Sequence, residues 1–214
     1  MLQIVIGNKK YSSWLLRGWL ALELTGAPYE EIVVALDMPD TAINIARYSP
    51  SGRVPLLIDG ALHVWDSLAI GEYLNEKFPN AEMWPSNPAM RARARSISAE
   101  MHSGFADLRN DCSMKILEQK PRPQLRPETQ KDINRIVMLW EESLTASGGP
   151  FLFGAKPCIA DAFYAPVVSR FRTYDLPTTP KTKAYCDTIW AWPSVQKWVA
   201  GAKAETIRAK RYED

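Results

Sequence analysis

Residues that build metal sites and disulfide frameworks are scarce in this chain. Its 214 residues include three cysteines and two histidines. Cys112, Cys158 and Cys186 lie far apart, and an odd number without a Cys-x-x-Cys pair disfavours both disulfide bonds and a thiolate zinc site. His63 and His102 are too few to make a zinc site on their own. We therefore expect no bound metal, and a reducing cytoplasm is the expected location.

An excess of charge of one sign is also missing. Lysines and arginines number 26 against 24 aspartates and glutamates, which leaves a formal net charge of +2. This balance gives no electrostatic argument for binding nucleic acid or anionic lipid. The alternating Arg91, Arg93 and Arg95 would splay around a helix, so they indicate a solvated face or a subunit contact.

Long hydrophobic runs are the third absence. No run approaches the roughly 20 apolar residues that a membrane span needs, so we expect no membrane partner. The apolar residues 1–6 lack a basic leader and a small-residue cleavage site, so we expect a first strand there rather than a secretion signal. With 46% hydrophobic and 23% charged residues, the chain has the composition of a globular protein that is large enough for a sizeable core.

Short apolar runs alternate with helical patterns over the first 80 residues. Asp59 and Gly60 form a two-residue hairpin turn. The order predicts a small α/β layer in which a βαβ unit comes first and a β-hairpin second. Strands are predicted over residues 2–6, 29–34, 54–58 and 62–64, and helices over residues 13–25, 40–48 and 66–77.

The composition changes near residue 79, where prolines and asparagines mark a linker over residues 80–88. The sequence therefore predicts a first domain over residues 1–79 and an all-helical second domain over residues 89–214. The segment 159–171 is apolar on nearly every side, which predicts a central helix, and Asp161 should cap its start. The helical patterns cover residues 89–117, 128–146, 159–171, 180–190 and 193–202.

Three short segments have the residue types of a ligand site. Ser12 and Ser13 stand at the start of the first predicted helix, where unpaired N–H groups stabilise an anion. The Val-Pro pair at 54–55 opens a strand, and a cis proline there would leave the preceding backbone free to pair with an extended ligand. Asp66 and Ser67 begin the next helix and could hold a zwitterion. Taken alone, each segment is more simply explained by a helix cap or a strand start.

Together, these segments resemble the cytosolic glutathione S-transferase superfamily, and the resemblance covers nearly the whole chain. Residues 11–17 (YSSWLLR) look like the serine-type active-site turn of zeta and theta-like bacterial members. Residues 49–55 (SPSGRVP) and 65–70 (WDSLAI) are similar to the segments that bind the glutathione backbone and its γ-glutamyl group. Residues 158–161 (CIAD) match a capping box of the second domain, with Cys158 in place of the hydroxyl residue. The resemblance implies an α/β thioredoxin-like N-terminal domain followed by an all-α helical-bundle C-terminal domain.

The resemblance also implies the site residues, position by position, with glutathione as co-substrate. Ser12 would stabilise the glutathione thiolate, and its spacing to Arg17 favours it over the alternative, Ser13. One serine would face the ligand while the other caps the helix. The implied glutathione-binding residues are Arg53 at the glycyl carboxylate, Val54 and Pro55 at the cysteinyl backbone, and Asp66 and Ser67 at the γ-glutamyl end.

The second substrate is expected in a cleft between the domains. Met101 and Phe105 could instead belong to the core, whereas His102 and Arg109 are harder to bury without partners. The candidate wall residues are Trp14, Met101, His102, Phe105, Arg109 and Tyr164.

Three functions are consistent with the resemblance. The first is a homodimeric glutathione transferase that attacks small, electrophilic, partly apolar compounds, as in detoxification. The second is a glutathione-dependent cis–trans isomerase of the maleylacetoacetate type, whose dicarboxylic substrate would need arginines in the cleft, with Arg109 and Arg170 as candidates. The third is a non-catalytic glutathione-binding or regulatory protein. Such relatives usually lose the serine or the acidic-Ser pair, both of which this chain retains.

Overall fold

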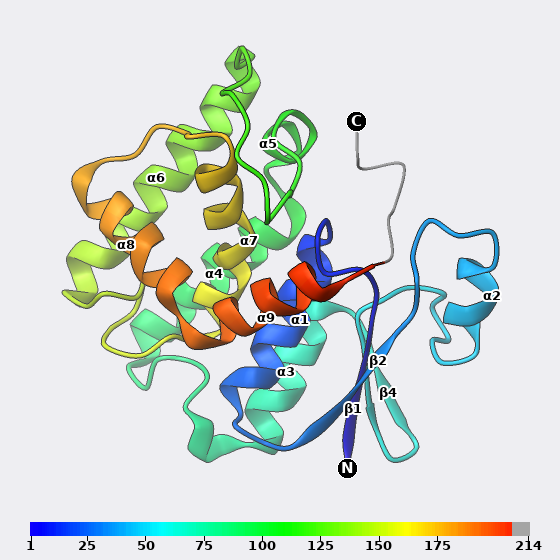
Figure 1. The fold of residues 1–214 in the computed structure, drawn as a ribbon. Coiled ribbons are helices and arrows are strands. Elements are labelled where there is room, and N and C mark those ends of the chain that lie inside the picture. Colours follow the sequence, from blue (N-terminus) through cyan, green and yellow to red (C-terminus); the bar gives the residue numbers. More distant parts are fainter. Residues whose placement is uncertain (207–214) are drawn as a thin grey trace.

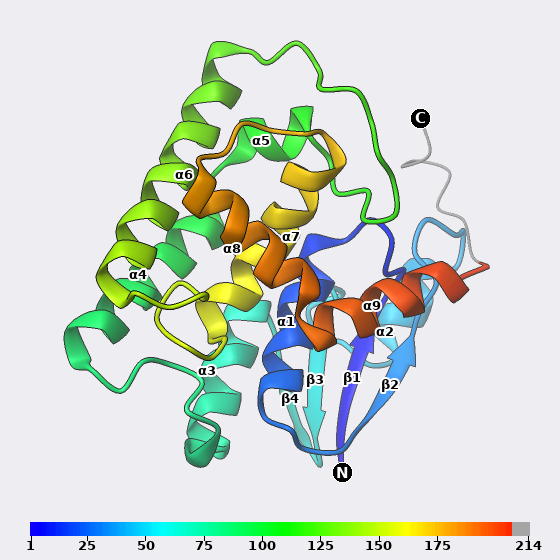
Figure 2. The ribbon, with the colours of Figure 1, turned by 60° about the vertical axis from the view of Figure 1, so that its left-hand side comes forward.

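The structure, a computed structural model, describes residues 1–206, with a sheet beside a helical half (Figure 1). It opens with a four-stranded sheet in the order β2-β1-β3-β4 (Figure 2). The strands are β1 (Leu2–Ile6), β2 (Tyr29–Val33), β3 (Leu56–Asp59) and β4 (Leu62–Val64). β1 pairs in parallel with β2 and antiparallel with β3, which in turn pairs antiparallel with β4. The predicted βαβ unit and hairpin are therefore confirmed.

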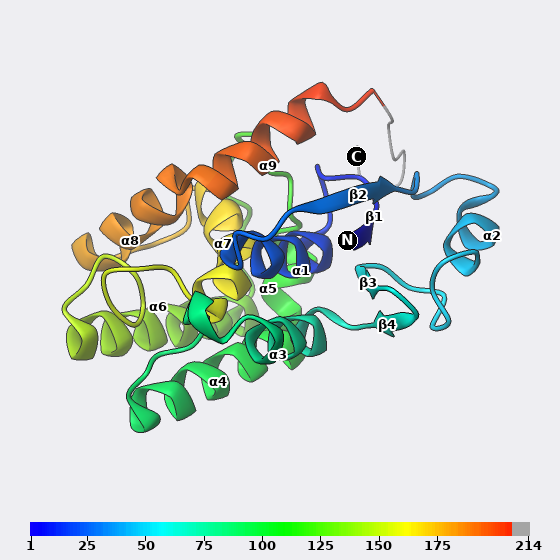
Figure 3. The ribbon, with the colours of Figure 1, turned by 90° about the horizontal axis from the view of Figure 1, so that it is seen from below.

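Helices cover both faces of this sheet. α1 (Ser13–Leu24) and α3 (Ser67–Lys77) lie on one face, and α2 (Thr41–Ala46) lies on the opposite side (Figure 3). Ile4 and Ile6 of β1 point into the main core with α1 and α3, whereas Val5 packs in a smaller cluster with Ile45 of α2. Because successive side chains of a strand point to opposite faces, β1 is buried on both, as its apolar sequence predicts.

The second half of the chain is helical within the described residues, as predicted. α7 runs through its centre, beside α1 and α4 and next to α8 (Figure 2). In α7 every residue except Arg172 is buried. The helices are α4 (Pro88–Ser103), α5 (Ala106–Asp111), α6 (Pro127–Ser147), α7 (Ile159–Thr173), α8 (Pro180–Ala191) and α9 (Pro193–Ala204). None of the helices in residues 1–206 is long and apolar enough to cross a membrane.

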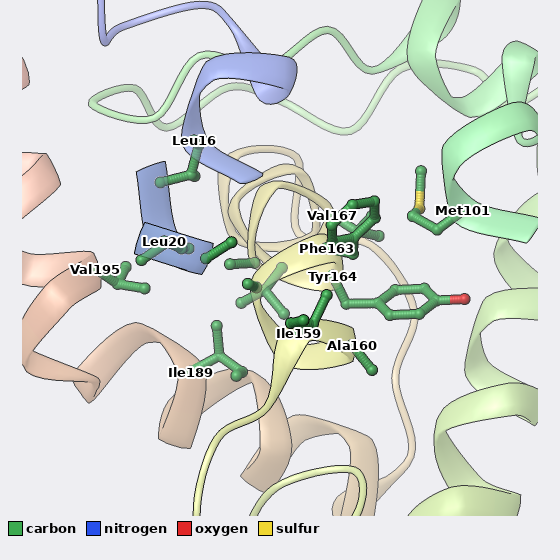
Figure 4. Close-up of a cluster of buried hydrophobic side chains, with 14 of the residues drawn as sticks. Leu16, Leu20, Met101, Ile159, Ala160, Phe163, Tyr164, Val167, Ile189 and Val195 are labelled. Carbon is green, nitrogen blue, oxygen red and sulfur yellow. The ribbon is translucent and has the colours of Figure 1, made fainter. Parts of the chain in front are cut away.

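The two halves share one continuous core, which α1 joins to α7. Leu16 and Leu20 of α1 belong to the same buried cluster as Phe163 of α7 and Val195 of α9 (Figure 4). A short 3-10 turn (Pro79–Ala81) and an extended stretch connect α3 to α4. The limits of the two domains, residues 1–79 and 89–214, stay a prediction.

The single helix expected over residues 89–117 is wrong. α4 ends at Ser103, Gly104 follows as its C-cap, and Phe105 takes a left-handed conformation with φ of 58° before α5 begins. The guanidinium of Arg109 stabilises this break, because it donates to the carbonyls of Gly104 and Met101 at the end of α4. Arg109 therefore does not share a continuous helix face with Met101.

Asp161 fixes the start of α7, as the sequence predicts. Its Oδ2 accepts the N–H of Cys158 at 2.9 Å, and its Oδ1 accepts the N–H of Leu152 at 3.0 Å and the hydroxyl of Tyr185 at 3.2 Å. With the Cys158 side chain, these contacts complete the capping box. Burial raises the pKa of this carboxyl, and the hydrogen bonds from Leu152 and Cys158 oppose the shift.

We expect Asp161→Ala to destabilise the whole chain. The substitution removes the common acceptor of three buried donors, so the free energy of unfolding in urea should fall by about 3–5 kcal/mol. Asp187→Ala is the matched control, because Asp187 is 53% exposed and pairs with Lys183 on the surface of α8. The control substitution should lower the free energy of unfolding by less than about 1 kcal/mol. Equal stabilities for the two variants would contradict the assigned role of Asp161.

Candidate active site

The N-terminus of α1 carries the two candidate serines. Ser12 is the N-cap residue, and its Oγ accepts the N–H of Leu15 in a long hydrogen bond of 3.5 Å. Ser13 is the first helical residue and is 5% exposed. Ser12, the serine expected to face the ligand, is therefore the residue that caps the helix, and Ser13 is not. Because Oγ acts as an acceptor in the cap, the Ser12 hydroxyl keeps its proton for donation.

The Val54–Pro55 peptide bond is cis, as the resemblance implies. Pro55 is buried against α1, where Gly18 permits the approach: a Cβ at position 18 would lie 2.9 Å from Pro55 Cγ. Among the hydrogen bonds of residues 1–206, none uses the Val54 backbone. The N–H and C=O of Val54 are therefore available to an extended ligand.

Asp66 and Ser67 form the start of α3. Asp66 is its N-cap, with Oδ1 accepting the N–H of Leu68 at 2.9 Å. The hydroxyl of Ser67 is buried and has no hydrogen-bond partner in residues 1–206. An unpaired buried donor at a helix N-terminus is suited to an anionic ligand group such as a carboxylate.

The segments around Val54 and Asp66 line a cavity of about 750 Å³, here called the outer cavity, and Trp14 of α1 completes this side of it. His102, from the last turn of α4, reaches it from the helical half, and its Nε2 lies 3.1 Å from Asp66 Oδ2. Arg53 is exposed at its edge. The outer cavity is lined by Trp14, Ser51, Arg53, Val54, Pro55, Trp65, Asp66 and His102. The structure thus brings together four of the five expected glutathione-binding residues, and Ser67 lies beside them at the start of α3.

A second cavity of about 230 Å³, here called the arginine cavity, lies at the N-terminus of α1. The 38% exposed indole of Trp14 lines both cavities and forms the wall between them. No acidic residue lines the arginine cavity. Its lining residues are Asn8, Tyr11, Ser12, Ser13, Trp14, Leu36, Arg109, Ser113, Met114 and Arg170.

Positive charge accumulates around this cavity. Arg170 is buried, with Nε bonded to the Cys112 carbonyl at 2.9 Å and Nη1 to the Pro166 carbonyl at 3.1 Å, which leaves Nη2 for the cavity. Burial, followed by the charge of Arg109, lowers the pKa of Arg170 to about 10. A bound anion would oppose this lowering, because a nearby opposite charge favours the charged form of an arginine.

Arg17 is a functional candidate that the sequence did not single out. It is fully buried, and its guanidinium has no hydrogen-bond partner in residues 1–206. Instead it lies 4.6 Å from the centre of the Trp14 ring, with Arg109 at 5.1 Å from the same ring. Burial and then the charges of Arg109 and Arg170 hold its pKa well below the usual range. The only sign of this role in the sequence is the position of an arginine among the apolar residues of the helix predicted over residues 13–25.

Three of the expected substrate-wall residues belong to the core. Met101 and Tyr164 are fully buried and Phe105 is 7% exposed, and none of the three lines either cavity. Tyr164 donates its hydroxyl to the Ile97 carbonyl at 3.1 Å and points toward α4 (Figure 4). Adjacent positions on a helix point about 100° apart, so Met101 faces the core while His102 faces Asp66. Of the predicted wall, Trp14, His102 and Arg109 line a cavity.

Neither metal chemistry nor a reactive thiol has an evident site in the described residues. No group of three or more histidine, cysteine or acidic side chains that could hold a metal ion occurs in residues 1–206. Cys112, Cys158 and Cys186 are free and buried. Burial raises the thiol pKa of Cys112 to about 11 and of Cys186 to about 12, and it also raises that of Cys158.

The arginine group on α4 is paired within the chain. Arg91 donates to the carbonyls of Pro85 and Ser86, whereas Arg93 and Arg95 form ion pairs with Glu142 and Glu72. These contacts occupy the guanidinium groups that were considered for a subunit contact.

Comparison with known proteins identifies the family. Residues 11–77 match the family described as glutathione S-transferase, N-terminal domain, and residues 123–201 match glutathione S-transferase, C-terminal domain. Maleylacetoacetate isomerase of Rattus norvegicus is 30% identical over 78% of this chain and 77% of its own length. Glutathione S-transferase Z2 of Arabidopsis thaliana is 30% identical over 75% of this chain and 74% of its own length.

Solved structures agree with this assignment. A glutathione transferase homologue from Burkholderia, with bound glutathione, is 25% identical and superposes with a TM-score of 0.72 over 95% of this chain and 99% of its own. The fold is shared with maleyl pyruvate isomerase, described as a bacterial zeta-class glutathione S-transferase, at 23% identity and a TM-score of 0.72 over 95% of this chain and 99% of the other. The chain therefore belongs to the glutathione S-transferase family of enzymes.

Proposed function

We propose that this enzyme binds glutathione in the outer cavity and activates its thiol at the N-terminus of α1. The activated sulfur would attack a small, electrophilic, partly apolar compound held in the arginine cavity. The observation that carries this proposal is the meeting of Ser12, the Val54 backbone and Asp66 around two cavities that share the Trp14 wall. Each of these features alone has a simpler explanation, but their convergence does not.

The proposed contacts match the chemistry of each part of glutathione. Asp66 holds the α-ammonium, and the N-terminus of α3 with the unpaired Ser67 hydroxyl holds the adjacent carboxylate. Val54 pairs through its backbone with the cysteinyl residue. Arg53, exposed at the cavity edge, reaches the glycyl carboxylate. These contacts would direct the sulfur toward Ser12.

The free energy needed to lower the pKa of the glutathione thiol is moderate. A free thiol has a pKa of about 8.5, and lowering it by ~2 units requires roughly 2.7 kcal/mol of preferential stabilisation of the anion. A hydroxyl donor to a charged acceptor contributes about 1.5–3 kcal/mol, and a helix N-terminus adds ~0.3–1 kcal/mol. Ser12 at the end of α1 therefore suffices, and we propose glutathione without a metal ion as the chemistry of this site.

A glutathione-dependent isomerase is the second candidate function, and the two arginines favour it. Arg109 and Arg170 both line the arginine cavity, which has no acidic lining residue. The cavity therefore favours a substrate that carries a carboxylate. Relatives named maleylacetoacetate isomerase, including a probable one from Caenorhabditis elegans that is 27% identical, are consistent with that chemistry.

The wider setting follows the family. We propose a cytoplasmic homodimer with a role in detoxification, in which α3 of one subunit faces α4 of the other. The intrachain pairs of Arg93 and Arg95 would have to be retained or exchanged at such an interface. Nucleic acid and membranes are not proposed as partners. A non-catalytic role is disfavoured because both serines and the Asp66–Ser67 pair are retained.

The first test is glutathione binding measured by calorimetry and thermal shift. We expect a Kd between micromolar and low millimolar, and a melting temperature that rises with ligand by mass action. Asp66→Asn retains an N-cap acceptor for α3 but removes the charge that holds the ammonium, so binding should weaken by at least about tenfold. Asp187→Asn is the exposed control. No heat and no thermal shift at millimolar glutathione would rule out the proposed function.

The second test separates the roles of Ser12 and Ser13 through thiolate absorbance of bound glutathione against pH. Removing the donor hydroxyl with Ser12→Ala should raise the thiol pKa by about 1–2 units, with binding retained. Because Ser12 is also the N-cap, Ser12→Ala should cost ~0.5–2 kcal/mol of stability. Ser12→Gly should show the same thiol pKa with only a few tenths of a kcal/mol lost, since glycine is tolerated at N-caps. A raised thiol pKa in Ser13→Ala alone would transfer the role to Ser13.

The third test compares an electrophile bearing a carboxylate with its methyl ester. If the arginine cavity receives the second substrate, kcat/KM at pH 7.5 should favour the acid by about tenfold or more, as expected for a charge-assisted hydrogen bond. Arg109→Gln should remove most of this preference while the variant still turns over the ester, which shows that the break stabilised by Arg109 persists. Arg95→Gln is the control, because Arg95 is an exposed arginine paired with Glu72. Preference for the ester in the unsubstituted enzyme would contradict the isomerase hypothesis and leave an apolar electrophile.

A further inference from the structure

His102 lines the outer cavity from the helical half of the molecule, whereas the other lining residues belong to the N-terminal half. Its Nε2 lies 3.1 Å from Asp66 Oδ2, while the other carboxylate oxygen accepts the N–H of Leu68 at 2.9 Å. Both oxygens of Asp66 are therefore engaged, and the carboxylate plane is fixed between α3 and α4. Since Asp66 accepts, the hydrogen bond requires the proton of the neutral imidazole to be on Nε2.

The surroundings of His102 favour its neutral form. Nδ1 is buried without a hydrogen-bond partner in residues 1–206, and the imidazole and the Trp14 ring form a T-shaped pair with their centres 5.0 Å apart. Three charged groups face it: Asp66 from the start of α3, Arg17 from α1 and Arg109 from α5. Burial lowers the pKa of His102 from 6.5, Asp66 opposes this shift, and the two arginines add to it.

We propose that His102 is a positioning residue which, when neutral, orients Asp66 for the α-ammonium of glutathione and, when protonated, competes with that ammonium for the same carboxylate. This inference rests on the proposed function, which assigns the ammonium to Asp66. One exposed carboxylate then serves two possible cations. Binding of the ligand and protonation of His102 oppose one another.

The sign of the pH dependence follows from this competition. The ammonium neutralises Asp66, so glutathione binding lowers the proton affinity of His102 further. By linkage, binding is strongest where His102 is already neutral and weakens as the pH falls through its pKa. An imidazolium left beside the bound ammonium would also repel it. The affinity for glutathione should thus fall in mildly acidic solution for a reason unconnected with the thiol.

The experiment uses S-methylglutathione, which retains the γ-glutamyl group but has no thiol to titrate. Its Kd is measured by calorimetry from pH 7.5 to 5.0 for the unsubstituted protein, for His102→Gln and for the control His63→Gln. Glutamine places an N–H donor near the position of Nε2 but does not titrate. We expect the unsubstituted protein and the His63→Gln control to bind about threefold or more weakly at pH 5.0, whereas His102→Gln keeps its pH 7.5 affinity across the range.

A second readout does not require His102→Gln to fold. The imidazole proton resonances of the full chain, assigned by their loss in His63→Gln, give the pKa of His102 with and without saturating S-methylglutathione. The expected result is a pKa that falls when the ligand is bound. An unchanged or raised pKa, or a pH dependence of Kd that persists in His102→Gln, would overturn the proposal. Failure of the unsubstituted protein to bind S-methylglutathione at pH 7.5 would overturn the proposed function itself, and this inference with it.

Discussion

The burial of α1 between the sheet and α7 is the constraint on which the rest of the site depends. From Ser13 to Leu22, every residue of the helix is buried except Trp14. A helix covered on both sides cannot rotate without exposing apolar surface, at about 25 cal/mol for each Å². The directions of its N-terminal N–H groups, of Trp14 and of Arg17 are therefore set by the core. Gly18 on the same helix lets Pro55 approach. α1 therefore positions three parts of the site: the Ser12 cap, the Trp14 indole and the cis peptide bond before Pro55.

The local parts of this arrangement were predictable from the sequence. Strand periodicity, the Asp59–Gly60 turn and the capping box of Asp161 each depend on residues within a few positions of one another. The three candidate ligand-binding segments were recognisable for the same reason. The sequence did not identify Ser12 as the N-cap, because either of two adjacent serines could precede the first helical residue. The hydrogen bond from the Leu15 N–H to Ser12 Oγ distinguishes them.

The parts that were not predictable depend on contacts between distant residues. Apolar residues continue at helical spacing from Met101 through Phe105 to Leu108, so periodicity alone gives no sign of the break after α4. The break is held by Arg109, whose guanidinium returns to the preceding helix. Met101 within α4 and Phe105 at the break both lie in the core. The burial of Arg17 between the two halves is equally invisible before the fold is known.

The two cavities on either side of Trp14 differ in charge. Asp66 lines the outer cavity, whereas Arg109 and Arg170 line the other without an acidic neighbour in the lining. A zwitterionic ligand is oriented by such a gradient, with its ammonium toward Asp66 and its most anionic atom toward the arginines. A thiolate at the boundary would lie in the positive field of the arginines in addition to the bond proposed with Ser12.

The burial of Cys112, Cys158 and Cys186 has a consequence for the durability of the catalyst. Reactive electrophiles and oxidised glutathione both modify proteins through accessible thiolates, and the rate depends on how much thiolate is present. With each thiol enclosed in the core and its pKa raised, none of the three presents a thiolate at neutral pH. Burial therefore protects the three cysteines of the folded chain from alkylation and from mixed disulfides with a small thiol.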